Sequence, residues 1–316
     1  MRALVTGGGG FVGLAICKAL IERGDEAIAM DISISPELQR LSDQHLGLSV
    51  RPCDMTNGDD VTQIFEKDQP TVVIHCAAVV GVMMSLSNPA NVFRINLEGT
   101  INLFEAMGRF DVKRMIHISS EENYGEFESD LITEDHPQYP LYSYGISKVA
   151  AEHLGRTYKL IHGLECINLR TSWVYGPDFP RKRVPCNLLE GAVSGEAVHV
   201  PFGAESKIDH TYIDDLVYGV IRALDCQNHL FDAYHIASGT CPSLNEIVKI
   251  IKELVPDADI SVGDGIYKHD GKISIPRKGA LDCTRARNAF GYVPQFDIKT
   301  GLTKYYEYLR VSQNQA

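Results

Sequence analysis

The first thirteen residues, Met-Arg-Ala-Leu-Val-Thr-Gly-Gly-Gly-Gly-Phe-Val-Gly (1–13), decide the fold class of this chain. The apolar run at 2–6 predicts a strand, and the apolar positions over 11–22 recur with the 3.6-residue period of a helix. Glycines between them permit a tight turn, a close approach of the backbone to a pyrophosphate and close packing of helix on strand. A glycine-rich run alone is weak evidence, but its strand–turn–helix setting predicts a dinucleotide-binding loop.

The same alternation continues through the first half of the chain, where short apolar runs are followed by longer amphipathic ones. Predicted strands lie at 2–6, 26–30, 48–51, 71–75 and 113–118, and predicted helices at 11–22, 36–45, 57–67 and 89–107. Strands that are covered on both faces should be almost wholly apolar, as Thr71-Val72-Val73-Ile74 is. The alternation predicts an α/β fold, a Rossmann-type doubly wound parallel sheet with helices on both faces.

The pattern changes after residue 165. A strand is expected at 166–169, an irregular stretch over 171–186, and helices at 186–194, 214–225, 243–254 and 297–309. We therefore expect a cofactor-binding Rossmann domain over 1–168, with 203–226 packing back on it. The remainder, 169–316, is expected to form a smaller α/β C-terminal lobe that binds the substrate.

Composition excludes several classes of partner. The 316 residues include 30 Lys and Arg against 41 Asp and Glu, which gives a formal net charge of −11. Binding to nucleic acid or to a membrane surface needs basic patches, so neither is expected. No apolar stretch approaches the roughly 18–20 residues that span a bilayer. Eight scattered cysteines without a CxxC pair favour reduced thiols over a disulfide scaffold or metal site, and hence a cytoplasmic protein.

Two aspartates follow predicted strands and could hold parts of a dinucleotide. Asp31 ends the second strand, 18 residues after Gly13, where a carboxylate can accept hydrogen bonds from both adenosine-ribose hydroxyls. The same carboxylate would repel a 2′-phosphate, so NAD is preferred over NADP; the alternative is a simple turn residue. Asp54 follows the strand at 48–51, and either holds the adenine amino group or caps a helix at 56–67.

Tyr144-Gly145-Ile146-Ser147-Lys148 opens a predicted amphipathic helix, which places Tyr144 and Lys148 one turn apart on one face. A nearby ammonium favours the phenolate and lowers the pKa of a tyrosine from its ordinary value of about 10. Tyr144 could then take a proton from an alcohol while hydride leaves for the nicotinamide, and Lys148 could also hold the nicotinamide ribose. Ser119-Ser120-Glu121-Glu122 follows the strand at 113–118, at the sheet edge where ligands bind, so a serine there can orient the substrate hydroxyl.

Through these and further motifs, the chain resembles the extended short-chain dehydrogenases/reductases of the NAD-dependent epimerase/dehydratase family. The resemblance runs over nearly the whole length. The motifs that carry it are TGGGGFVG at 6–13, His75-Cys76-Ala77-Ala78, Asn96 before LEGT, SSxxxYG at 119–125, YGISK at 144–148, LRTSWVYGP at 169–177, TYIDD at 211–215 and GYVP at 291–294.

The resemblance implies an NAD-dependent enzyme whose catalytic trio is Ser120, Tyr144 and Lys148. It assigns the cofactor to Gly7, Gly10, Phe11, Val12, Gly13, Asp31, Asp54, Met55, Ala77, Ala78, Asn96, Tyr144 and Lys148. For a small carbohydrate-like substrate we expect Val80, Ser85, Glu121, Trp173, His210 and Arg277. Family resemblance also implies a homodimer that forms through the helices at 89–107 and 143–161.

The chain departs from the family pattern where nucleotide sugars are bound. Members that act on such sugars usually carry Asn three residues after the Arg of the LR motif, where this chain has Trp173. They usually carry Arg before the next motif, where this chain has Ile208, with Lys207 one position away. Arg277 could match the family's second phosphate-binding arginine. Without two polar anchors a diphosphate loses charge-assisted bonds, so a carbohydrate or hydroxy acid without a nucleotide is a serious alternative; Trp173 could equally be a packing residue.

The net reaction depends on the fate of the ketone that oxidation produces. A sugar epimerase rotates the ketone and returns the hydride to its other face, and we expect this reaction first. A dehydrogenase, close behind, releases ketone and NADH. Third is a 4,6-dehydratase, in which Glu121 and Glu122 would serve as acid and base, with Glu122 as the catalytic group that eliminates water. An NAD-sensing module is the alternative outside the enzymes, and the intact Ser–Tyr–Lys set argues against it.

Overall fold

The computed structural model describes residues 1–315, which divide into two compact units. Unit 1 comprises Met1–Gly125, Pro137–Arg170 and Val217–Tyr234. Unit 2 comprises Glu126–His136, Thr171–Leu216 and the chain from His235 onward. Within residues 1–315, no helix is both long enough and apolar enough to cross a membrane.

A seven-stranded sheet underlies unit 1, in the order β11-β7-β5-β4-β1-β2-β3. Its strands are β1 (Arg2–Thr6), β2 (Glu26–Asp31), β3 (Leu48–Pro52), β4 (Val72–His75), β5 (Arg114–Ser120), β7 (Glu165–Thr171) and β11 (Ala233–Ile236). The pairings of β3 with β2, β2 with β1, β1 with β4 and β4 with β5 are all parallel. The strand order reverses beside β1, as in a doubly wound Rossmann sheet, and this confirms the predicted fold class.

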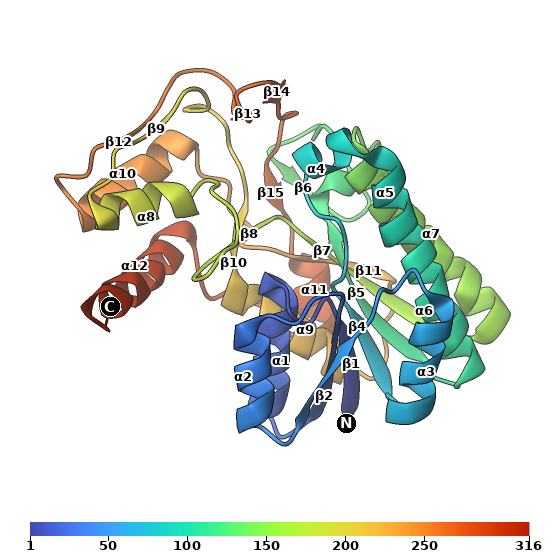
Figure 1. Ribbon diagram of the computed structural model, residues 1–316. Coiled ribbons are helices and arrows are strands. Elements are labelled where there is room, and N and C mark those ends of the chain that lie inside the picture. Colours follow the sequence, from blue (N-terminus) through green and yellow to red (C-terminus); the bar gives the residue numbers. More distant parts are fainter. Residues whose placement is uncertain (316) are drawn as a thin grey trace. The chain divides into compact units, whose positions relative to one another are not determined.

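Helices cover both faces of this sheet (Figure 1). One face carries α1 (Phe11–Glu22) and α2 (Pro36–Gln44), and the other carries α3 (Gly58–Asp68), α6 (Gly99–Arg109) and α7 (Ser143–His162). Strand residues Leu4, Val73 and Met115 are fully buried in one core cluster with Phe65 of α3 and Phe104 of α6. This packing explains why the strands are nearly all apolar and the helices amphipathic.

The predicted helix at 89–107 is divided in the structure. It consists of α5 (Pro89–Phe93), a π-helical turn (Arg94–Glu98) and α6, and it is preceded by the short helix α4 (Val82–Ser87). The turn carries Asn96, whose side chain is bonded to the backbone of Val79. A Cβ at Gly99 would lie 2.5 Å from the Met55 side chain, so the chain passes very close to its neighbour here. π-Helical turns are frequent at functional sites.

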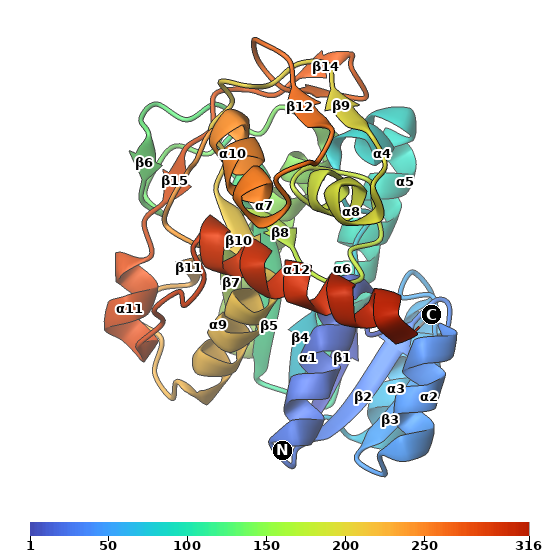
Figure 2. The ribbon, with the colours of Figure 1, turned by 90° about the vertical axis from the view of Figure 1, so that its left-hand side faces the viewer.

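Unit 2 contains short paired strands and a group of helices. The helices α8 (Cys186–Ser194), α10 (Leu244–Leu254) and α12 (Ile298–Gln315) pack against one another (Figure 2). The parallel pairs are β8 (Trp173–Tyr175) with β10 (His210–Tyr212), β9 (Val198–Val200) with β12 (Ile260–Val262), and β6 (Leu131–Ile132) with β15 (Ala280–Leu281). β13 (Lys268–His269) and β14 (Ile273–Ser274) pair antiparallel. Two further helices are α9 (Ile213–Asp225), which continues into unit 1, and α11 (Thr284–Phe290).

Several details of the second half differ from prediction, among them the helix α11 (Thr284–Phe290), which was not predicted. β8 lies inside the stretch at 171–186 that we expected to be irregular, because it is stabilised by pairing with β10 from far along the chain. The last helix ends at Gln315 and not at 309, and residues 310–315 include Arg and Gln, which have high helix propensity.

Candidate functional site

The loop between β1 and α1 is shaped by glycines. Gly7 has a φ of 67°, in the left-handed region, and a Cβ there would lie 2.8 Å from the backbone nitrogen of Ala77. A Cβ at Gly13 would overlap the Gly7 carbonyl oxygen, so only glycine allows α1 to pack this closely. Gly10 directly precedes α1. The loop therefore leads into a helix N-terminus, which attracts anions such as a pyrophosphate.

Asp31, at the end of β2, is bonded to this loop. Its Oδ2 accepts a hydrogen bond from the Gly9 backbone N–H at 2.9 Å, and its Oδ1 accepts one from the Ser33 N–H at 3.3 Å. A carboxylate has about four acceptor positions, so Asp31 can still accept bonds from ribose hydroxyls. A glycine cradle that a Cβ would fill, a helix N-terminus and this carboxylate together fit a dinucleotide such as NAD.

Asp54 is placed differently. Its Oδ1 accepts hydrogen bonds from the backbone N–H and the hydroxyl of Thr56, at 2.9 and 2.8 Å, and these bonds lower the pKa of Asp54. It does not cap a helix, because α3 begins at Gly58 and its capping side chain is Asn57. The capping alternative for Asp54 is therefore wrong, and the contact with adenine stays a prediction.

The other predicted cofactor residues divide into two groups. Phe11 and Val12 form the first turn of α1, and Ala77 and Ala78 follow β4, with the Ala77 N–H donating to Thr6 Oγ1 at 3.2 Å. The side chains in the second group face the protein, because Met55 is buried in the core cluster and Asn96 is bonded to the backbone of Val79 and to Ser147. Asn96 thereby fixes the loop after β4.

Tyr144 and Lys148 lie in the first two turns of α7 and are both buried. The Lys148 Nζ is 6.0 Å from the centroid of the Tyr144 ring, so the structure brings the predicted pair together. Burial lowers the pKa of Lys148 to about 8, which still leaves an ammonium at neutral pH. A Cβ at Gly145 would overlap the Glu122 carbonyl oxygen, so α7 packs directly on the loop after β5.

That loop contains Ser120 and the two predicted acidic residues. Ser120 ends β5, and its Oγ accepts a hydrogen bond from the Glu122 N–H at 3.1 Å, which caps a short 3₁₀ helix (Glu121–Asn123). Glu121 is buried and Glu122 is half-buried. The two carboxylates thus differ in environment, as their proposed division into an acid and a base requires.

Sequence reasoning missed a buried ion pair in this region. Glu152 of α7 and Arg170 of β7 are 2.6 Å apart, and their side chains are 0% and 3% exposed. Glu152 Oε1 also accepts hydrogen bonds from Ser119 Oγ at 2.6 Å and Asn123 Nδ2 at 2.7 Å, and Arg170 donates to the Tyr124 hydroxyl at 2.8 Å. A glutamate on the buried side of an amphipathic helix, one turn after Lys148, was the available sequence signal.

In unit 2, Trp173 and His210 lie opposite each other in the β8–β10 pair, with ring centroids 6.0 Å apart. Trp173 also contacts Tyr267 at 5.6 Å and stacks on His269 at 5.8 Å, and the Arg183 guanidinium lies 4.4 Å above its ring. Trp173 is therefore the centre of an aromatic cluster that one cation covers.

One of the two ring nitrogens of His210 forms a hydrogen bond with the backbone. Its Nδ1 donates to the Ile208 carbonyl oxygen at 2.9 Å, because a carbonyl can only accept. Burial lowers the pKa of His210 to about 3, so the ring is neutral and Nε2 is an acceptor. Among the described residues, no hydrogen-bond partner is found for Nε2.

The remaining predicted substrate residues have diverse surroundings. Arg277 is exposed, and its guanidinium lies 2.7 Å from Asp130, which Lys207 approaches at 3.4 Å. Val80 is 40% exposed. Ser85 is fully buried, and its hydroxyl donates to the Val82 carbonyl oxygen at 2.8 Å.

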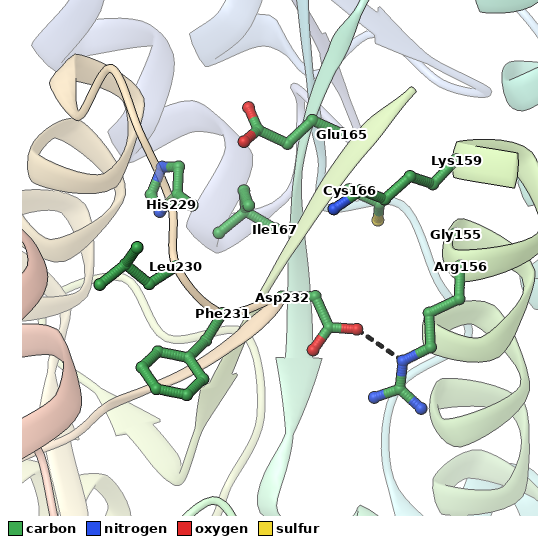
Figure 3. A pocket seen from close by; sticks show the side chains of 10 residues that line it. All are labelled: Gly155, Arg156, Lys159, Glu165, Cys166, Ile167, His229, Leu230, Phe231 and Asp232. Carbon is green, nitrogen blue, oxygen red and sulfur yellow. Dashed lines mark hydrogen bonds and ion pairs between the residues drawn. The ribbon is translucent and has the colours of Figure 1, made fainter. Parts of the chain in front are cut away.

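Unit 1 also contains a cavity of about 320 Å³ outside the predicted site. It is lined by Gly155, Arg156, Lys159, Glu165, Cys166, Ile167, His229, Leu230, Phe231 and Asp232. Figure 3 shows Arg156 reaching from α7 toward Asp232, and the two side chains form an ion pair at 2.5 Å. None of the predicted catalytic or cofactor residues lines this cavity.

Comparisons with known proteins agree with the motifs. The model of the NAD dependent epimerase/dehydratase family matches residues 3–237. A putative UDP-glucose 4-epimerase of Methanocaldococcus jannaschii is 29% identical over 97% of this chain and 98% of its own length. The solved UDP-glucose 4-epimerase of Thermotoga maritima with UDP-glucose has a TM-score of 0.89 and 28% identity, covering 99% and 100% of the two chains. That of Thermus thermophilus with NAD has a TM-score of 0.85 and 25% identity, covering 98% and 99%.

Proposed function

Because the chain belongs to the NAD-dependent epimerase/dehydratase family and is thus an NAD-dependent enzyme, we propose that it is a sugar epimerase. The observation that carries the proposal is the buried Tyr144–Lys148 pair, which packs on the loop that contains Ser120. A module that only binds NAD has no need of a phenol beside a buried ammonium.

We assign the chemistry as follows. Bound NAD would supply the acceptor for the substrate's hydride and, once reduced, the donor that gives it back to the ketone, with Gly7, Gly10 and Gly13 around its pyrophosphate. Tyr144 takes the proton of a secondary hydroxyl of the substrate, Ser120 orients that hydroxyl, and the Lys148 ammonium stabilises the phenolate. Tyr144 returns the proton to the substrate oxygen once the ketone has turned its other face, and the product is the epimer.

Relatives of the chain are UDP-glucose 4-epimerases, so a nucleotide sugar is the first substrate to test. The experiment is a panel of UDP-sugars, free sugars, and uronic and aldonic acids, each incubated with the enzyme and NAD. We expect one member to yield an epimer without accumulation of NADH. Failure of every member to be isomerised or oxidised would reject the proposal.

A second candidate is a dehydrogenase of a sugar or hydroxy acid without a nucleotide. It is favoured by the surroundings of the positions where nucleotide-sugar enzymes of the family usually bind the diphosphate. Trp173 is enclosed by aromatic rings, Ile208 is fully buried, and Arg277 and Lys207 are both paired with Asp130. In the panel this candidate predicts NADH accumulation with a free sugar or acid, and no reaction with UDP-sugars.

Three further assignments complete the proposal. Residues 1–168 are the NAD-binding domain, and residues 169–316 are the substrate lobe. The enzyme is a cytoplasmic homodimer that forms through the helices within 89–107 and 143–161. Sedimentation of a monomer at micromolar concentration would reject the dimer.

A further inference from the structure

The amino group of Lys148 is anchored to strand β5. Its Nζ donates to the Ile118 carbonyl oxygen at 2.7 Å and lies 3.2 Å from Nε2 of His117. An ammonium has three N–H groups, so two of them are directed at β5. Lys148 is only 4% exposed, so water contributes little to its solvation, and these two acceptors decide where the charge sits relative to the Tyr144 ring.

The hydrogen bonds around His117 fix its tautomer. Asn168 donates through Nδ2 to the Asp232 carbonyl oxygen at 2.9 Å, which identifies its Oδ1 as the acceptor 2.9 Å from His117 Nδ1. His117 Nδ1 therefore carries the proton, and Nε2 presents its lone pair to Lys148. Burial lowers the pKa of His117 to about 3, so the ring stays neutral and does not repel the ammonium.

We propose that His117, oriented by Asn168, is a positioning residue for proton transfer, because it holds the Lys148 ammonium beside Tyr144. It acts through Lys148, because its ring lies beside the Lys148 Nζ and is only 1% exposed. This inference rests on the proposed function, in which Tyr144 is the acid–base group. No part of the YxxxK or serine motifs identifies His117 or Asn168, which lie on β5 and β7.

The other titratable groups around Lys148 do not replace this role. Burial raises the pKa of Cys76 to about 12, so it remains a neutral thiol, and the carboxylate of Glu152 is ion-paired within unit 1. His75 stacks on His117 with ring centroids 5.5 Å apart, but its two nitrogens are bonded to threonine hydroxyls at 2.7 and 2.9 Å. His117 is thus the side chain whose removal takes an acceptor from Lys148.

The test compares His117→Phe with His117→Gln. Phenylalanine removes the acceptor from a buried ammonium, so the pKa of Lys148 should fall by about one unit from its value of about 8. The ammonium fraction at pH 7 then falls from about nine-tenths to about one half, so the alkaline limb of the kcat/KM profile should move down by about one pH unit and kcat/KM at pH 7 should fall roughly twofold. Glutamine can accept a hydrogen bond from Lys148 and donate one to Asn168. His117→Gln should therefore restore most of the Lys148 pKa and most of kcat/KM.

His75→Phe is the matched control, because it is equally buried and aromatic but does not bond Lys148. It should lower stability without moving the profile. The pKa of Lys148 can be followed by NMR of the lysine Cε carbon in NAD-bound protein. This measurement reports on the position of the ammonium and does not require turnover. If His117→Phe does not fold, Asn168→Ala should shift both readouts in the same direction.

The outcomes separate this inference from the proposed function. Unchanged Lys148 titration and an unchanged profile in a folded, active His117→Phe would overturn the inference alone. A shifted Lys148 titration in a wild-type protein that turns over no panel member would overturn the function and leave the placement of Lys148 by His117 intact.

Discussion

The phosphate loop at 6–13 and the region around the start of α7 both belong to unit 1, yet one is formed by backbone groups and the other by side chains. The loop is made of backbone, and its shape depends on the absence of Cβ atoms at Gly7 and Gly13. The region at α7 is made of side chains, because Tyr144 and Lys148 lie among buried polar groups contributed by β5, α7 and β7. The loop at 6–13 is therefore sensitive to added side-chain volume, and the region at α7 is sensitive to the loss of a charged group.

The backbone region serves cofactor binding, and the side-chain region serves proton transfer. Backbone N–H groups and a helix N-terminus can hold a pyrophosphate without any basic surface, which agrees with a chain of net charge −11. Proton transfer needs a phenol beside an ammonium, and a buried ammonium needs acceptors around it. Substitutions in the two regions should therefore fail in different ways.

The largest effect is expected for Tyr144→Phe. Loss of the acid–base hydroxyl should lower kcat by roughly 10²–10⁴-fold, as for general acid–base groups elsewhere. NAD should still bind, because the loop at 6–13 is untouched and the phenyl ring of residue 144 is kept. Steady-state kinetics and NAD titration by calorimetry give the two numbers, and full turnover in this variant would disprove the assigned role.

Glu152→Gln tests the charge beneath the site. It leaves the guanidinium of Arg170 buried without its counter-ion, which should lower the free energy of unfolding by about 3–5 kcal/mol. Chemical denaturation measures the loss. Glu253→Gln breaks the exposed pair with Lys299 and should leave stability close to wild type. Equal stabilities of the two variants would show that the buried pair contributes no more than a surface pair.

Gly13→Ala tests the backbone region. The added Cβ meets the Gly7 carbonyl oxygen, and overpacking of this kind costs about 1–3 kcal/mol, so the Kd for NAD should rise roughly ten- to hundredfold. Gly47→Ala is the control, since a Cβ there makes an ordinary contact at 3.4 Å. Wild-type NAD affinity in Gly13→Ala would remove the steric argument for the loop.

The smallest expected effect concerns how the free energy of unfolding depends on pH, and it involves His75. Burial holds the pKa of His75 well below its ordinary value of 6.5, so the unfolded chain takes up a proton below that pH and the folded one does not. Stability from this group is present above pH 6.5 and is lost on acidification. His75→Gln should make the decline between pH 6.5 and 5 shallower, by up to about 1.4 kcal/mol per pH unit at the acid end, in denaturant titrations. An identical slope in both proteins would contradict a neutral buried ring.

The comparison also shows which parts of the molecule a sequence can predict. The bounds of β1 and α1 agree with the prediction at both ends, because strand and helix periods are local. The π-helical turn at Arg94–Glu98 and strand β8 could not be predicted, since each depends on contacts with residues distant in sequence, such as Asn96 with Val79.

The candidate site follows the same rule. Tyr144 and Lys148 are one helical turn apart, so their proximity can be predicted from spacing alone. The pairs Glu152–Arg170 and His117–Asn168 join different elements, and no pattern in the local sequence predicts them. Their roles and those of the predicted substrate residues stay predictions until the variants are measured.

Epimerisation through transient oxidation is tested most directly by running the wild-type reaction in D₂O, with the sugar that the panel identifies. The hydride returns to the carbon that it left, so we predict an epimer that carries ordinary hydrogen at the inverted carbon, with no accumulation of NADH. Deuterium at that carbon, or steady accumulation of NADH with ketone, would contradict a sugar epimerase.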